Sequence, residues 1–238
     1  MIKLFQPPPA FNAANPSPFC IKLEVLLKMS GLPYEIIIEG DPRKGPTGKI
    51  PFVEIAGERY GDSNFIQKKL QHDHGTDFDK ELSDKEKSIS LAFTRLIEEH
   101  LYWVLLYSRW MEDANWPIIN RLFFGSMPIP LKWFLPNVIR KQVEKQLYGH
   151  GVSRLPKTVM YKMAADDLAA IAGFLENKET MFGGEPTALD ATLYGILSSI
   201  IDADFDTELK RSAMAHQNLV AYTSNMRQRY FPELPKPT

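Results

Sequence analysis

The chain opens with two strand-like runs of apolar residues separated by a clear helical pattern. β-branched and aromatic residues at 2–6 and 34–38 predict two short strands. Pro18 suits the first turn of a helix between them, and Gly31 suits its end. One face of that helix carries Phe19, Leu23, Leu26 and Leu27. A strand, a helix and a strand with a right-handed crossover make the two strands parallel.

Residues 45–64 predict a hairpin followed by a second helix. The strand-forming residues 50–55 begin with a proline, and a strand tolerates a missing N–H at its first position. Ala56-Gly57 provides the turn, so the sheet is mixed. Asp62-Ser63 offers an N-cap before the apolar positions of a helix. We expect the bond between Ile50 and Pro51 to be cis.

The remainder of the chain has helical periodicity. The polar segment 72–79 is expected to be a linker, and Ser83 is expected to cap the helix that follows. Thr187 and Asp190 have the spacing of a reciprocal N-terminal cap before a strongly apolar helix. The apolar face of the helix after Ser83 is formed by Ile89, Phe93, Leu96, Ile97, Leu101 and Val104.

The segment 116–139 is rich in aromatic and aliphatic residues but contains several prolines. Those prolines are Pro117, Pro128, Pro130 and Pro136. They argue against one continuous helix, because an internal proline removes a hydrogen bond and clashes with the preceding turn. We expect short helices that cover the core, in preference to a surface for a partner or a membrane.

Composition narrows the function. The net charge is −1, which does not favour nucleic acid as a partner. The single cysteine, Cys20, excludes an internal disulfide and suits a reducing compartment. The first residues do not have the composition of a leader, and we find no apolar run long enough to span a bilayer. These features predict a cytoplasmic, globular protein.

Ser17 and Cys20 lie at the junction between the first strand and the first helix. A helix N-terminus stabilises an anion through its free N–H groups and its dipole. A serine is not a thiolate at neutral pH, but its hydroxyl can donate a hydrogen bond to the thiolate of another molecule. Cys20 falls within the first turn, where we expect it to be packed rather than reactive. His72-Asp73-His74 matches no common helix-borne zinc motif, so no metal is predicted.

Three motifs together resemble the glutathione S-transferase family, and in particular its branch with failed-axon-connections proteins and metaxins. The first is Ser17-Pro-Phe-Cys20. The second is Lys49-Ile-Pro-Phe, followed by the hairpin and by Asp62-Ser63 at the start of a helix. The third is Gly183-Gly-Glu-Pro-Thr-Ala-Leu-Asp190. The resemblance implies an α/β thioredoxin-like domain over residues 1–75 and an all-helical domain over 83–232. It also implies a homodimer, with glutathione as co-substrate.

The resemblance implies a role for each candidate residue. Ser17 would stabilise the glutathione thiolate, and the backbone of Ile50 would pair with the cysteinyl unit. Asp62 and Ser63 would hold the γ-glutamyl end, and Lys49 would face the glycyl carboxylate. A pocket for a small apolar electrophile would be bordered by Trp103, Tyr107 and Trp110. The resulting function is glutathione conjugation or detoxification of such electrophiles.

Two other functions remain open at this point. In many transferases a helix that binds the glycyl end of glutathione precedes the cis-proline, but residues 39–49 leave no room for one. The first alternative is therefore a non-catalytic, metaxin-like module that uses 116–139 to bind a protein or a membrane surface. The second is a reductase that works through Cys20, which the serine at position 17 disfavours.

Overall fold

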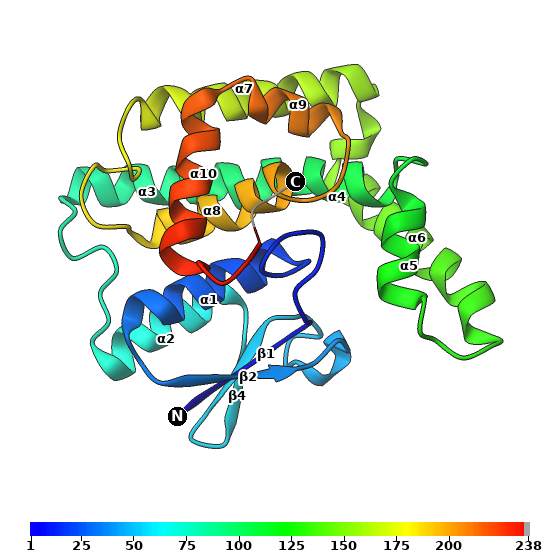
Figure 1. Ribbon diagram of the computed structural model, residues 1–238, viewed down its shortest axis with the longest axis horizontal. Helices are drawn as coiled ribbons and strands as arrows, with labels where there is room; N and C mark the ends of the chain where they lie inside the picture. Colours follow the sequence, from blue (N-terminus) through cyan, green and yellow to red (C-terminus); the bar gives the residue numbers. More distant parts are fainter. Residues whose placement is uncertain (236–238) are drawn as a thin grey trace.

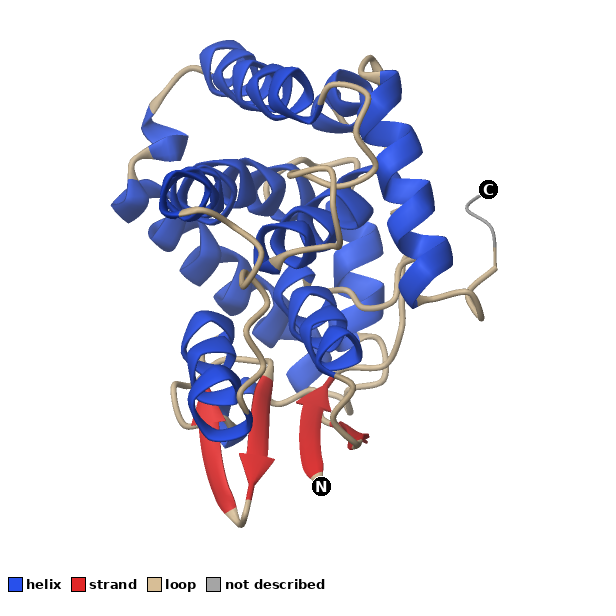
Figure 2. Cartoon of the chain, turned by 90° about the vertical axis from the view of Figure 1, so that its left-hand side faces the viewer, coloured by secondary structure: helices blue, strands red, loops and turns tan. Residues whose placement is uncertain are grey.

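The computed structural model describes residues 1–235, which form a small sheet with helices packed above it (Figure 2). Its strands are β1 (Ile2–Gln6), β2 (Tyr34–Ile38), β3 (Phe52–Ile55) and β4 (Glu58–Gly61). The strand order is β2-β1-β3-β4, with β1 parallel to β2 and antiparallel to β3, and with β3 antiparallel to β4. The predicted mixed sheet is therefore confirmed.

The helices α1 (Pro18–Ser30) and α2 (Ser63–His74) pack on the same face of this sheet. Their shared apolar core is formed by Ile2, Leu4, Leu23, Leu27, Val53, Ile66 and Leu70. Gly31 adopts the left-handed conformation that ends α1, as predicted. One prediction is wrong: residues 72–74 continue α2 rather than form a linker, and Gly75 ends that helix.

The second half of the chain is helical (Figure 1). The helices α3 (Asp84–Leu96) and α4 (Tyr102–Trp110) are joined by a π-helical turn at Ile97–Leu101, and α7 (Lys157–Leu175), α8 (Ala188–Ile201), α9 (Glu208–Met214) and α10 (Gln217–Tyr230) follow. Short 3-10 turns occupy Pro42–Lys44 and Val152–Arg154. Within residues 1–235, no helix is both long enough and apolar enough to span a bilayer.

Helix α8 lies at the centre of the molecule and packs closely against α1. Gly195 permits this approach, because a Cβ atom there would lie 2.5 Å from the carbonyl oxygen of Pro18. The predicted cap of α8 is confirmed: Asp190 accepts hydrogen bonds from the backbone N–H and the hydroxyl of Thr187, both at 2.8 Å. Ser83 also caps α3, through a reciprocal pair with Glu86. These caps fix where α8 and α3 begin.

The helices α5 (Trp116–Phe124) and α6 (Leu131–His150) form a hairpin that stands away from the rest of the molecule (Figure 1). Pro117 fits the first turn of α5, but Pro136 lies inside α6, where we expected a break. The expected burial is also wrong for much of this segment. Its exposed large apolar side chains are Ile118, Leu122, Phe123, Ile129, Leu131, Trp133, Phe134 and Val138.

Candidate functional site

The N-termini of α1 and α2 meet at one edge of the sheet. Phe5, near the end of β1, pairs with Phe52 at the start of β3, and Phe52 pairs with Gly61 at the end of β4. The loop to α1 leaves this edge from β1, and α2 begins directly after β4. Each helix N-terminus carries free N–H groups and partial positive charge, so the edge suits an anionic ligand.

Ser17 is the N-cap residue of α1, and its carbonyl oxygen accepts hydrogen bonds from the N–H groups of Cys20 and Ile21. Its side chain does not cap the helix, and its hydroxyl is within hydrogen-bond reach of the thiol of Cys20. The N–H of Ser17 donates to Asn15 Oδ1 at 3.1 Å, and the amide of Asn15 donates to the carbonyl oxygen of Pro7 at 2.8 Å. The side chain of Asn15 therefore links the start of α1 to the beginning of the loop that follows β1.

Ser17 opens onto a cavity of about 750 Å³. One side of the cavity is formed by Ser17, Lys49 and Ile50, together with residues of the loop 40–43. The other side is mostly apolar and comes from α4, α5, α6 and the connection between α5 and α6. Its lining residues are Tyr102, Leu105, Leu106, Arg109, Trp110, Ile119, Phe123, Phe124, Met127, Leu135 and Ile139. Such a cavity could hold a polar thiol compound beside an apolar one.

The bond between Ile50 and Pro51 is cis, as predicted. The loop before it contains only a short 3-10 turn, also as predicted. Arg43 in this loop binds the carboxylate of Asp41 through two nitrogens, which lowers the pKa of Asp41 to about 2. Lys44 pairs with Glu39 at 2.7 Å. Lys49 forms no ion pair among residues 1–235, so its charge is the most available of the three for a carboxylate.

Asp62 and Ser63 lie at the start of α2 and are not among the residues that line this cavity. Asp62 has a φ of 68° and accepts a hydrogen bond from the N–H of Phe65 at 2.9 Å, so it is the cap of α2. Ser63 is the first helical residue and is buried. The structure therefore brings Ser17, Lys49 and Ile50 together in one cavity and leaves Asp62 and Ser63 at the adjoining helix N-terminus.

A buried ion pair that we did not predict lies next to Ser63. Lys22 Nζ on α1 is 2.7 Å from Glu98 Oε1 in the π-helical turn, and both side chains are buried. Asn64 accepts a hydrogen bond from Lys22 and donates one to Glu98, each at 2.7 Å. The only local signal was a lysine within the apolar run of α1, because its partners lie far away in the sequence.

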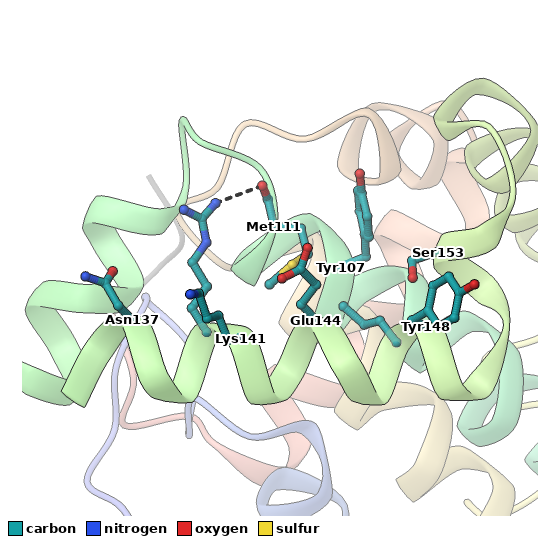
Figure 3. A pocket seen from close by; sticks show the side chains of 9 residues that line it. Tyr107, Met111, Asn137, Lys141, Glu144, Tyr148 and Ser153 are labelled. Carbon is teal, nitrogen blue, oxygen red and sulfur yellow. Dashed lines mark hydrogen bonds between the residues drawn. The ribbon is translucent and has the colours of Figure 1, made fainter. Parts of the chain in front are cut away.

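The three aromatic residues that we expected to border one pocket lie in different places. Trp110 lines the cavity beside Ser17, but Tyr107 lines a separate hollow of about 640 Å³ between α4 and α6 (Figure 3). Trp103 lines neither and stacks on His150 with 4.4 Å between ring centroids. Trp103 and Tyr107 are therefore not walls of this cavity, because His150 and Tyr161 pack against that side of α4 instead.

Arg109 has contacts near Ser17 that we did not predict. Its guanidinium is buried and donates to the carbonyl oxygens of Pro16 at 2.7 Å and Ser199 at 2.6 Å. No carboxylate in the described part of the chain pairs with it. Burial lowers the pKa of Arg109 to about 10, so it is still a cation at neutral pH. Arg109 thus fixes the residue before Ser17 and contributes positive charge near it.

Cys20 is fully buried, as we expected, and burial raises the pKa of its thiol. A buried, protonated thiol is a poor nucleophile. This disfavours a reductase that works through Cys20. Among the described residues, no three His, Cys, Asp or Glu side chains gather in a way that could hold a metal ion.

The chain belongs to the glutathione S-transferase family. Residues 18–115 match the model of the glutathione S-transferase N-terminal domain, and residues 164–226 match that of the C-terminal domain. The fold agrees: a β-etherase, LigF, from Sphingobium sp. strain SYK-6 has a TM-score of 0.64 at 15% identity over 98% of both chains. A glutathione S-transferase from Methylobacterium radiotolerans, solved with glutathione sulfonate, has a TM-score of 0.59 at 16% identity and covers 100% of this chain and 96% of that one.

The relatives by sequence include a transferase as well as proteins with other names. The isoprene-epoxide–glutathione S-transferase of Rhodococcus sp. strain AD45 is 30% identical over 97% of this chain and 99% of its own length. Failed axon connections of Drosophila melanogaster is 28% identical over 91% of this chain, which spans only 55% of that protein. Metaxin-1 of Macaca fascicularis is 26% identical over 88% of this chain and 70% of its own length.

Proposed function

We propose that this protein conjugates glutathione to small apolar electrophiles. The observation that carries the proposal is the cavity beside Ser17. It has a helix N-terminus and a serine hydroxyl on one side and a largely apolar wall on the other. A thiolate bound at the first side would lie next to an apolar compound held by the second.

In this proposal Ser17 donates a hydrogen bond to the glutathione sulfur and lowers the pKa of that thiol. The backbone of Ile50 pairs with the cysteinyl unit, Lys49 faces the glycyl carboxylate, and Asp62 with Ser63 binds the γ-glutamyl end. The thiolate then forms a carbon–sulfur bond to the electrophile. Catalysis arises from stabilisation of the thiolate and from the proximity of the two reactants.

An epoxide is the first electrophile to test, because a relative that is 30% identical carries isoprene epoxide in its name. Attack of the thiolate on one epoxide carbon breaks a carbon–oxygen bond, and the resulting alkoxide takes a proton from water. A small epoxide is mostly apolar, as is the wall formed by α4, α5 and α6.

The test is the pH dependence of conjugation for the wild type, Ser17→Ala and Cys20→Ser. Ser17→Ala should raise the pKa of the bound thiol and reduce turnover at neutral pH, while glutathione affinity falls less. Each pKa unit corresponds to about 1.4 kcal/mol between the two protonation states. Cys20→Ser is the control and should retain activity. An unchanged profile in Ser17→Ala would remove Ser17 from the mechanism.

The second candidate is a non-catalytic binding module, which the exposed apolar hairpin α5–α6 favours. Similarity to Failed axon connections and Metaxin-1, whose names do not describe a transferase, supports it as well. Calorimetric titration with glutathione separates the two candidates. Binding at micromolar to millimolar concentrations with turnover supports the transferase, whereas neither binding nor turnover supports the module.

A further inference from the structure

The tip of the α5–α6 hairpin exposes large apolar side chains to solvent. Trp133 is 71% exposed, Ile129 is 65% exposed and Phe134 is 51% exposed. They lie on the connection between the helices and on the first turn of α6, at the end of the hairpin that stands away from the other helices (Figure 1). A soluble chain does not usually gather such residues on one protrusion without a binding role.

Basic residues follow this apolar tip along the outer face of α6. Phe134, Val138, Lys141 and Lys145 recur at i, i+4, i+7 and i+11 and therefore share one face, and all four are exposed. Residues 116–150 contain five basic residues and one acidic residue, a net charge of +4. Because the whole chain carries −1, the remaining residues carry −5. Arg140, one of the five basic residues, pairs with Asp113 just before this segment, which reduces the excess to +3. The hairpin therefore carries more positive than negative charge, unlike the rest of the chain.

The spacing of the two zones matches the layers of a lipid surface. Lys141 follows Phe134 by seven residues, which is about 10 Å along a helix axis. Interfacial helices bury their apolar side chains about 5–10 Å into the boundary of headgroups and acyl chains. Lysines at the next level can then meet anionic headgroups, and tryptophan is favoured at the interface itself.

We propose that the tip of the α5–α6 hairpin binds the surface of bilayers that contain anionic phospholipids. The hairpin falls between the two parts of the chain that match the family models, residues 18–115 and 164–226. It does not depend on the proposed transferase activity. It also does not require a membrane-spanning helix, since the apolar residues enter only one leaflet.

The test is sedimentation of the whole protein with vesicles of phosphatidylcholine alone and of phosphatidylcholine mixed with phosphatidylserine. The wild type should sediment with the mixed vesicles and much less with the neutral ones, and added salt should weaken the binding. Two variants address the two zones: Trp133→Ser/Phe134→Ser and Lys141→Glu/Lys145→Glu. Each should weaken binding to the mixed vesicles by about tenfold or more.

The matched control is Lys68→Glu/Lys85→Glu, which makes the same change in charge at exposed positions of α2 and α3. It should bind the mixed vesicles within about twofold of the wild type. If this control loses binding as strongly as the Lys141/Lys145 variant, only net charge matters and the proposal falls. It also falls if both vesicle types bind equally or if neither hairpin variant changes binding.

A second copy of the chain is the other occupant that the experiment can reveal. Sedimentation velocity without lipid gives the mass of the wild type and of Trp133→Ser/Phe134→Ser. The same mass for both supports a surface that is free to meet lipid. A wild type that is larger than the variant would mean that copies of the chain cover the tip, and would overturn the proposal.

Discussion

The buried pair of Lys22 and Glu98 gives a quantitative test of how the sheet half and the helical half are joined. The two side chains are only 2% and 5% exposed, and Asn64 on α2 hydrogen-bonds both of them. Burial lowers the pKa of Lys22, and the carboxylate of Glu98 acts against that shift. Glu98→Ala removes the carboxylate and leaves the ammonium of Lys22 buried with Asn64 alone.

The expected loss is about 3–5 kcal/mol of unfolding free energy, because a buried charge without its partner costs far more than an exposed one. The matched control is Asp166→Ala. It removes the exposed i,i+4 partner of Lys162, whose Nζ lies 2.6 Å from the carboxylate, and should cost about 0.3–0.5 kcal/mol. The double variant Lys22→Met/Glu98→Leu replaces both charges with apolar side chains of similar size and should recover most of the loss.

The assay is urea unfolding followed by both circular dichroism and tryptophan fluorescence. Coincident curves justify a two-state analysis, and a lower midpoint with an unchanged slope reports a loss of stability. If Glu98→Ala is as mild as Asp166→Ala, the buried pair does not form as described. If the double variant is no more stable than Glu98→Ala, the cost does not come from the unpaired charge.

Three further predictions test the site and its surroundings. Ser63→Ala should weaken glutathione binding in calorimetry by about 1.5–3 kcal/mol, with little loss of stability because the preceding residue caps α2. Equal affinity would reduce Ser63 to a helix residue. Gly195→Ala should lower stability by about 1–3 kcal/mol, since its Cβ would lie 2.5 Å from a carbonyl oxygen of α1. Gly149→Ala, with open space around it, should instead be neutral or stabilising. Because burial raises its pKa, the thiol of Cys20 should stay protonated and resist a thiol reagent at mildly alkaline pH until the chain is unfolded; rapid native labelling would contradict this.

Local pattern was enough to predict the strands, α1, the helix caps and the mixed sheet. Each depends on neighbours within a few residues: Gly31 ends α1, and Thr187 with Asp190 begins α8. The junction that carries Ser17 followed in the same way from a strand, a proline-rich loop and a helix start.

The features that were missed depend on distant contacts. Arg109 binds the carbonyl oxygens of Pro16 and Ser199, which are about ninety residues away in either direction. Which side of α4 faces the cavity depends on what packs against its other sides. Trp103 stacks on His150, and Tyr107 packs against Tyr161, so neither faces the cavity. Apolar composition did not reveal that the tip of the hairpin is exposed, since hydrophobicity alone does not determine which helix faces find a partner.

The α5–α6 hairpin belongs to both the proposed transferase site and the proposed lipid-binding surface, but different side chains serve each. Its inner side chains, including Leu135 and Ile139, form part of the cavity wall, whereas Trp133 and Phe134 do not line the cavity. A hairpin whose tip binds a lipid surface would hold the cavity close to the layer where apolar electrophiles concentrate. Conjugation of a water-soluble electrophile does not require the cavity to be near lipid. Trp133→Ser/Phe134→Ser should therefore lose vesicle binding and keep that turnover, whereas Ser17→Ala should show the opposite pair of results.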